Sequence, residues 1–177
     1  MCKNLKLIPL LILLTYCFDT PHTLRVAPLF SDGMVLQRNK IVDIWGTASP
    51  NTDIQILSEW GQKLSTKSND TGAWKAKLTT ANAGGPFFLK INTNKESFTI
   101  KDILIGEVWL ASGQSNMEMS LMGYPPKDTI LNYKEEIRRA NYPFIRMFNV
   151  EKQFSIVPSK DFKGFWLEAS PSQIEKF

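Results

Sequence analysis

Short runs of apolar and β-branched residues, separated by turn-forming clusters, constrain the fold of this chain more than any other feature. Apolar and polar positions partly alternate within these runs, as is typical of half-buried strands. The predicted strands are Val35–Gln37, Ile41–Trp45, Asp53–Leu57, Trp74–Leu78, Phe87–Ile91 and Ser97–Ile100. Clusters of Gly, Asp, Asn and Pro, which favour turns, lie between them at residues 31–33, 46–50, 69–72 and 84–86. Strands at this spacing predict an antiparallel β-sandwich domain over residues 24–101.

The pattern changes after Ile100. Residues 103–111 are almost continuously apolar, which is expected of a strand covered on both faces in a parallel sheet. An amphipathic stretch from about Lys127 to Ala140 predicts a helix, Phe144–Val150 predicts a second strand, and residues 170–172 resemble a helix start. Strand, helix, strand is the opening unit of an α/β fold, so residues 102–177 are predicted to begin such a domain. We expect this domain to be incomplete, because two parallel strands alone leave open edges and an uncovered apolar face.

Composition excludes some classes of function. The 177 residues are 43% hydrophobic and 21% charged, which is usual for a globular protein that buries a core. The net charge of +4 comes from scattered lysines and not from a clustered basic stripe, so no nucleic-acid partner is expected. The densest charge cluster, residues 134–139, mixes acidic and basic side chains and predicts paired charges on a solvated helix face. Trp45, Trp60 and Trp74 are expected in the core more than as sugar-stacking residues.

The N-terminus has the layout of a signal peptide over residues 1–20. Lys3 and Lys6 precede the apolar run Leu7–Leu14, and polar residues follow Phe18. This run is shorter than the roughly 20 residues of a membrane-spanning helix, so we expect export to the periplasm or the exterior without a stable membrane span. Cleavage near residues 20–23 would remove both cysteines, Cys2 and Cys17. Lipid anchoring at Cys17 is the alternative.

Ser115 is a candidate nucleophile from its neighbours alone. A buried strand that ran directly into residues 112–116 and then into a helical turn would place its hydroxyl where open α/β sheets form their sites. Gly113 would allow the tight turn, and the unpaired amides of the next turn would stabilise an oxyanion. The pattern is not the Gly-x-Ser-x-Gly of α/β-hydrolases, and a helix-capping serine is the competing interpretation. Met117, Met119 and Met122 are expected to pack around the turn, because thioethers without Cys or His rarely form a metal site.

Residues 106–119, Gly-Glu-Val-Trp-Leu-Ala-Ser-Gly-Gln-Ser-Asn-Met-Glu-Met, resemble the nucleophile block of the sialate O-acetylesterase family, a branch of the SGNH hydrolases. Residues 29–38, 44–46 and 71–74 resemble the β-sandwich that precedes the hydrolase domain in that family. The resemblance implies that Ser115 attacks an acetyl ester, with Gly113, Gln114 and Asn116 supporting the turn and the oxyanion. It implies no metal or cofactor, and its substrate is an O-acetylated sialic acid. An acetylxylan-type esterase, acting on another acetylated glycan, remains an alternative.

The family's catalytic Asp and His, and its other oxyanion-hole residues, have no counterpart in these residues. The sequence has one histidine, His22, which lies beside the predicted cleavage site and is not expected to be catalytic. The resemblance therefore covers an N-terminal portion of the family's fold. We expect the isolated chain to be essentially inactive, because loss of the general base lowers kcat in serine proteases by a factor on the order of 10⁴–10⁶. Alternatives are a non-catalytic glycan-binding module and a pseudogene fragment or split gene; no oligomeric state is predicted.

Overall fold

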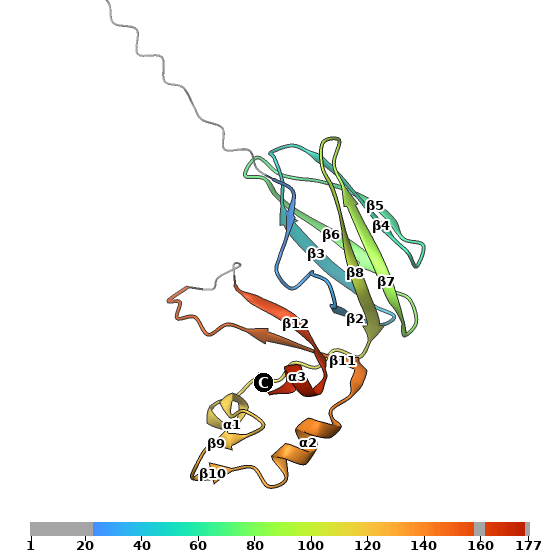
Figure 1. Ribbon diagram of the computed structural model, residues 1–177. Coiled ribbons are helices and arrows are strands. Elements are labelled where there is room, and N and C mark those ends of the chain that lie inside the picture. The colour runs from blue at the N-terminus through green and yellow to red at the C-terminus, as the bar shows by residue number, and fades with distance from the viewer. Residues whose placement is uncertain (1–22, 158–161, 176–177) are drawn as a thin grey trace, which may run out of the picture.

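The computed structural model describes residues 23–157 and 162–175 (Figure 1). A β-sandwich occupies the chain up to Gly106, and short helices and hairpins follow it. The predicted signal peptide, both cysteines and His22 lie outside the described residues. Within the described part of the chain, no helix has the length and apolarity needed to cross a bilayer.

Eight strands of the described chain form the sandwich, in two sheets. The three-stranded sheet has the order β1 (Arg25–Val26), β3 (Ile41–Thr47) and β6 (Ala73–Thr79). The five-stranded sheet has the order β2 (Val35–Gln37), β8 (Ser97–Gly106), β7 (Gly84–Asn92), β4 (Asp53–Ser58) and β5 (Lys63–Lys67). Neighbouring strands are antiparallel except β2 and β8, which run parallel. The sheets match the predicted β-sandwich.

The core lies between these two sheets. Alternate residues of β6 point inward, and Trp74 and Leu78 are 3% and 0% exposed. They meet an equally buried apolar layer from the five-stranded sheet, which comprises Ile54, Ile56, Leu89, Ile91, Ile100 and Ile103. The core prediction is confirmed for Trp74. Trp45 and Trp60 are half-buried at the margin of the core, where Trp45 packs edge-on against Phe30 with ring centroids 4.8 Å apart.

Strand β5 is absent from the sequence-based prediction. It contains one apolar residue, Leu64, among Lys, Ser and Thr, so it carries little of the signal that marks a strand. It lies at the edge of the five-stranded sheet and pairs with β4 alone. An edge strand with one face to solvent tolerates such a polar composition.

The predicted strand over residues 103–111 is wrong in its length and in its sheet. Strand β8 ends at Gly106 and belongs to the sandwich, where Ile103, Leu104 and Ile105 are buried. Residues 107–114 have no regular secondary structure, and Trp109 and Leu110 are 88% and 95% exposed. The apolar run is therefore divided between a buried half inside the sandwich and a solvent-facing half that no strand in the described chain covers.

The expected parallel strand–helix–strand unit does not form among the residues described after Gly106. Strand β11 (Tyr142–Val150) coincides with the predicted second strand, but it pairs antiparallel with β12 (Gly164–Ala169). A further antiparallel pair joins β9 (Gly123–Tyr124) and β10 (Asp128–Thr129). Residues 103–106, which were expected to form the parallel partner of β11, belong instead to strand β8 of the sandwich.

Helix α2 (Tyr133–Arg139) is shorter than the predicted helix over residues 127–140. The residue before it, Asn132, has a φ of 61°, a left-handed conformation that cannot continue a helix toward the N-terminus. Glu135 pairs with Arg138 at 2.7 Å on the exposed face, so the predicted charge pairing on a solvated helix is confirmed. Helix α3 (Pro171–Ile174) begins with proline after Ser170, as residues 170–172 predicted.

Two side chains of the β11–β12 hairpin attach it to the sandwich. The guanidinium of Arg146 donates to both carboxylate oxygens of Asp102, at 2.7 and 3.2 Å. The indole nitrogen of Trp166 donates to the carbonyl of Leu29 at 2.8 Å. Because the Arg146 side chain is only 10% exposed, this contact is shielded from solvent on the arginine side.

Candidate active site

Ser115 is the first residue of the single-turn helix α1 (Ser115–Glu118). Its side chain is exposed, and among the described residues none forms a hydrogen bond with its hydroxyl. The amide of Met117 donates to the carbonyl of Gln114 at 2.9 Å, and that of Met119 donates to the carbonyl of Ser115 at 3.1 Å. The chain therefore turns sharply at the serine and leaves the hydroxyl open to a substrate.

The backbone amides of Ser115 and Asn116 are unpaired within the described part of the chain. The first amides of any helix have no partner inside the helix and point outward from its start. No side chain caps this helix, and the preceding Gln114 has a non-helical backbone with a φ of −100° and a ψ of −142°. The two amides are thus available to an external acceptor.

Gly113 lies close to a side chain that the sequence did not place against it. A Cβ atom at this position would lie 2.7 Å from the Cγ atom of Met117, closer than real Cβ contacts come. Met117 thus folds back over the glycine and closes the turn from one side. The expectation that Met117 packs around this turn agrees with this contact.

Gln114 and Asn116 flank the serine, and both side chains are exposed. Neither takes part in a hydrogen bond with another described side chain. The structure therefore places Gly113, Gln114, Ser115 and Asn116 on one exposed turn. It brings no histidine or acidic partner to the serine hydroxyl, and no group of three or more His, Cys, Asp or Glu in the described ranges could hold a metal ion.

Glu107, the first residue of the segment between β8 and α1, makes contacts that the sequence did not predict. One carboxylate oxygen accepts from the Gln37 side chain at 2.7 Å, and the other accepts from Arg38 Nε at 2.6 Å. These two hydrogen bonds, that of Gln37 foremost, hold the pKa of Glu107 below its ordinary value. Residues 29–38 and 106–119 are two of the stretches that carry the family resemblance, but nothing in the sequence indicated that they touch.

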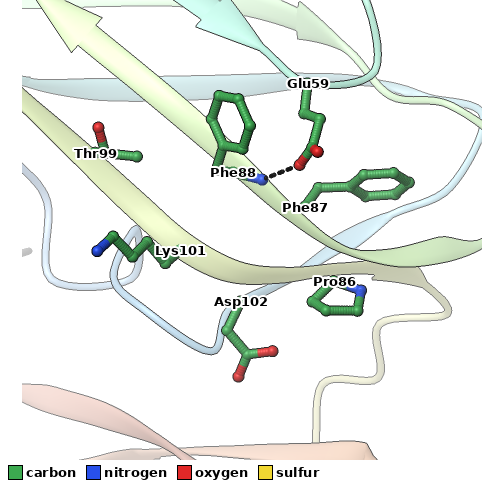
Figure 2. A pocket seen from close by; sticks show the side chains of 7 residues that line it. All are labelled: Glu59, Pro86, Phe87, Phe88, Thr99, Lys101 and Asp102. Carbon is green, nitrogen blue, oxygen red and sulfur yellow. Dashed lines mark hydrogen bonds between the residues drawn. The ribbon is translucent and has the colours of Figure 1, made fainter.

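A shallow hollow lies on the surface of the sandwich (Figure 2). Its lining consists of Glu59, Pro86, Phe87, Phe88, Thr99, Lys101 and Asp102. A carboxylate oxygen of Glu59 accepts from the amide of Phe88 at 3.0 Å, while the Phe88 ring stays 42% exposed. The hollow includes none of residues 113–116, so it does not form part of the site around Ser115.

Comparisons with known proteins agree with the family resemblance found in the sequence. No family model matches the chain. Over 137 residues, or 71% of the chain, it is 31% identical to the human sialate O-acetylesterase and 30% identical to the mouse one. The chain belongs to a sialate O-acetylesterase-like family.

A solved structure supports the same membership. The crystal structure of a carbohydrate acetylesterase from Xanthomonas citri superimposes with a TM-score of 0.79 and 33% sequence identity, over 86% of this chain. The chain spans 25% of the human esterase, 24% of the mouse one and 34% of the Xanthomonas chain. These relatives are thus much longer than the 177 residues of this sequence.

Proposed function

We propose that this protein acts as a carbohydrate esterase that removes O-acetyl groups from sialic acid, with Ser115 as the nucleophile. The observation that carries the proposal is the exposed Ser115 hydroxyl, which, like the amides of its turn, has no hydrogen-bond partner within residues 23–157 and 162–175. It occurs in a chain about 30% identical to sialate O-acetylesterases. A serine that only capped a helix would turn its hydroxyl back to an amide of that helix, and Ser115 does not.

The chemistry would proceed in two steps. The Ser115 hydroxyl loses its proton to a base and attacks the acetyl carbonyl, and the bond to the sugar oxygen then breaks. The sugar leaves as an alcohol after it takes up a proton, and water releases acetate from the acetyl-serine. In this proposal the amides of Ser115 and Asn116 would stabilise the anionic oxygen, while Gly113 and Gln114 would shape the turn. A group outside the described residues would act as the base.

The acetylated sugar is the least constrained part of this proposal. The mammalian relatives are named for sialate, whereas the Xanthomonas structure is described more broadly as a carbohydrate acetylesterase. Acetyl-ester cleavage is the same reaction on either sugar, so an acetylxylan-type substrate is the alternative within this function. Neither substrate requires a cofactor for this mechanism.

In the experimental test, imidazole in solution acts as the general base that takes the proton of Ser115. The 177-residue chain is incubated with an activated acetate ester, with and without imidazole, and acetylation is mapped by peptide mass spectrometry. We expect little reaction without imidazole and acetylation of Ser115 in its presence. The matched control is Ser112→Ala, which changes another exposed serine of the same segment and should leave the signal at Ser115. Acetyl groups spread equally over Ser112 and Ser115 would contradict the proposal.

A glycan-binding role without catalysis is the second candidate, and the hollow in Figure 2 is the observation that favours it. The exposed Phe88 ring offers an apolar face of the kind that packs against sugars. Glu59, Thr99 and Lys101 place polar groups around that ring. Such a mixture of an aromatic face and a few polar groups is common in small-molecule sites.

Titration of the chain with acetylated and de-acetylated sialosides separates the two functions. Binding that is lost in Phe88→Ala but kept in Ser115→Ala supports the glycan-binding role. Binding that prefers the acetylated sugar and depends on Ser115 supports the esterase. Ile41→Ala is a suitable control, since Ile41 is an exposed apolar residue of the sandwich that does not line the hollow.

A further inference from the structure

The segment that carries Ser115 leaves the sandwich beside strand β2. Gln37 pairs with Gly106 at the end of the parallel β2–β8 ladder. The amide of Arg38 then donates to the carbonyl of Gly106 at 2.8 Å. The backbone is therefore held up to the last residue of β8.

Side-chain hydrogen bonds fix the next two residues, Glu107 and Val108, as well. The carboxamide of Gln37 donates to Glu107 and, through its oxygen, accepts from the amide of Val108 at 2.8 Å. Arg38 binds the other oxygen of Glu107. Gln37 thus makes a two-point contact whose donor and acceptor both lie on the departing segment. We name the contacts of Gln37 and Arg38 with Glu107 and Val108 the exit clasp.

Beyond the exit clasp the segment is not held by hydrogen bonds. Among the described residues, none of residues 109–113 makes one. Trp109 and Leu110 are almost fully exposed, so packing does not fix them either. The clasp is consequently the last contact that sets the direction of the chain before the turn at Gln114 and Ser115.

We propose that Gln37 and Arg38 are positioning residues, which act through Glu107 and Val108 to set the direction in which the Ser115 segment leaves the sandwich. The proposal rests on the proposed role of Ser115 as nucleophile. Displacement of a nucleophile by about 1 Å can cost about 100-fold in rate, so a contact that aims the segment has a catalytic consequence. The sandwich is in this view part of the machinery that places the nucleophile.

The same part of the sandwich also holds the hairpin. Leu29 accepts from Trp166, and Asp102 of β8 accepts from Arg146. The stretch 29–38 therefore contacts both the departing segment and the hairpin.

The experiment measures the position of residue 115 directly. Spin labels are attached at Ser115→Cys and at Lys90→Cys, an exposed position of β7, in the full chain with Cys2→Ser and Cys17→Ser. Double electron–electron resonance gives the distribution of the distance between them. We expect the distribution to be narrower in the parent chain than in Gln37→Ala or Glu107→Ala, because the exit clasp restricts the directions that the segment can take. The double variant should be no broader than either single variant, because both residues act through one contact.

Controls separate positioning from stability. Thermal unfolding shows that each variant keeps the sandwich, and Glu107→Gln serves as a milder change because it removes the charge and keeps the shape. Glu135→Ala breaks an exposed ion pair of α2 and should leave the distance unchanged.

A distribution that is equally wide in the parent chain, in Gln37→Ala and in Glu107→Ala would overturn the proposal. This measurement does not involve catalysis. It therefore stands or falls separately from the role of Ser115, which the acetylation experiment tests.

Discussion

The sandwich and the region after Gly106 differ in how much of their apolar surface they bury. The sandwich encloses one continuous core, and Ile41 and Phe88 are its only large apolar residues that are exposed within the described chain. Every other exposed large apolar residue of the described ranges lies beyond Gly106, and there the buried apolar residues are Ile137, Ala140 and Ala169. Burial of apolar surface is the main favourable term in folding, so the sandwich has what it needs to fold and the second region has little.

This difference matters because Ser115, the candidate nucleophile, lies after Gly106, in the region that buries less apolar surface. Ser115 is held by a local turn and by the exit clasp, and not by a core of its own. The sandwich therefore supplies the rigid reference on which the segment depends. A site built in this way is sensitive to the contacts that link the two regions.

The largest expected effect is a loss of stability in the sandwich core. Leu78→Ala removes a side chain that is 0% exposed and should lower the free energy of unfolding by about 2–5 kcal/mol. The matched variant Leu110→Ala, at a residue that is 95% exposed, should change it by less than about 0.5 kcal/mol. Urea denaturation followed by tryptophan fluorescence measures both. Equal losses would mean that the two regions share one core.

Arg146→Ala should have the next largest effect, because it removes one of the two side-chain contacts that attach the hairpin to the sandwich. Loss of the two hydrogen bonds to Asp102 should cost about 1–2 kcal/mol, less than for a fully buried pair because the Asp102 side chain is 44% exposed. Arg138→Ala, in the exposed pair with Glu135, should have a smaller effect, because solvent screens an ion pair between exposed side chains. Hydrogen exchange of the β12 amides reports the change. Unaltered exchange in Arg146→Ala would show that the hairpin is held by other contacts.

Gly113→Ala should alter the serine turn without altering the sandwich. The added Cβ would lie 2.7 Å from Met117 Cγ, so the Met117 side chain must move away from the turn or the turn must open. We expect the imidazole-dependent acetylation of Ser115 to fall, while the urea midpoint stays within error of the parent chain. Ser112→Ala serves as the neighbouring control. If Gly113→Ala retained full acetylation, the contact with Met117 would not matter for the reactivity of the serine.

Acid should weaken the exit clasp and leave the sandwich intact, which is the smallest effect. The pKa of Glu107 is lowered, foremost by its hydrogen bond from Gln37, so its contribution is fully present above the ordinary carboxyl value of about 4.3. The contribution is lost as the pH falls through the lowered pKa. The pKa of Asp43 is likewise lowered, first by its hydrogen bond with Lys75, but β3 and β6 are also held by their ladder and the core.

Nuclear magnetic resonance on an acid titration distinguishes the two carboxylates. Protection of the Val108 amide should fall as Glu107 is protonated, whereas the amides of β3 and β6 should stay protected over the same pH range. In Glu107→Gln the Val108 amide should show no such dependence. A titration in which Val108 stays protected throughout would show that the Gln37 carboxamide holds the segment without the charge.

The sequence predicted the strands correctly where one buried face makes apolar and polar residues alternate. Strand β2 was predicted with its observed bounds, Val35–Gln37, and the predicted strands that became β3, β4, β6 and β7 lie within the observed ones. Strand β5 was missed because its polar residues carry no apolar alternation. The run over residues 103–111 misled because continuous apolarity does not reveal which sheet a strand joins. The domain boundary predicted at residues 101 and 102 stays a prediction.

The candidate site was predictable in part. The block around Ser115 could be recognised from its residues, and its turn is indeed exposed. The exit clasp could not be foreseen, because the pairing of Gln37 with Glu107 depends on the register of a parallel ladder between residues some 70 positions apart. Gly113 was expected to allow a tight turn, but the close approach of the Met117 side chain to it was not foreseen.

The two borders of the five-stranded sheet also bear on the solubility of the protein. At one border the three-residue strand β2 is followed by the exit clasp, and at the other β5 is exposed with Lys63 and Lys67 at its ends. A second molecule that tried to extend the sheet along β5 would bring lysines from the two copies together and meet like-charge repulsion. Lysines on an open strand are a recognised defence against edge-to-edge aggregation. The polar composition that hid β5 from sequence analysis is thus the property that keeps neighbouring molecules from polymerising through it.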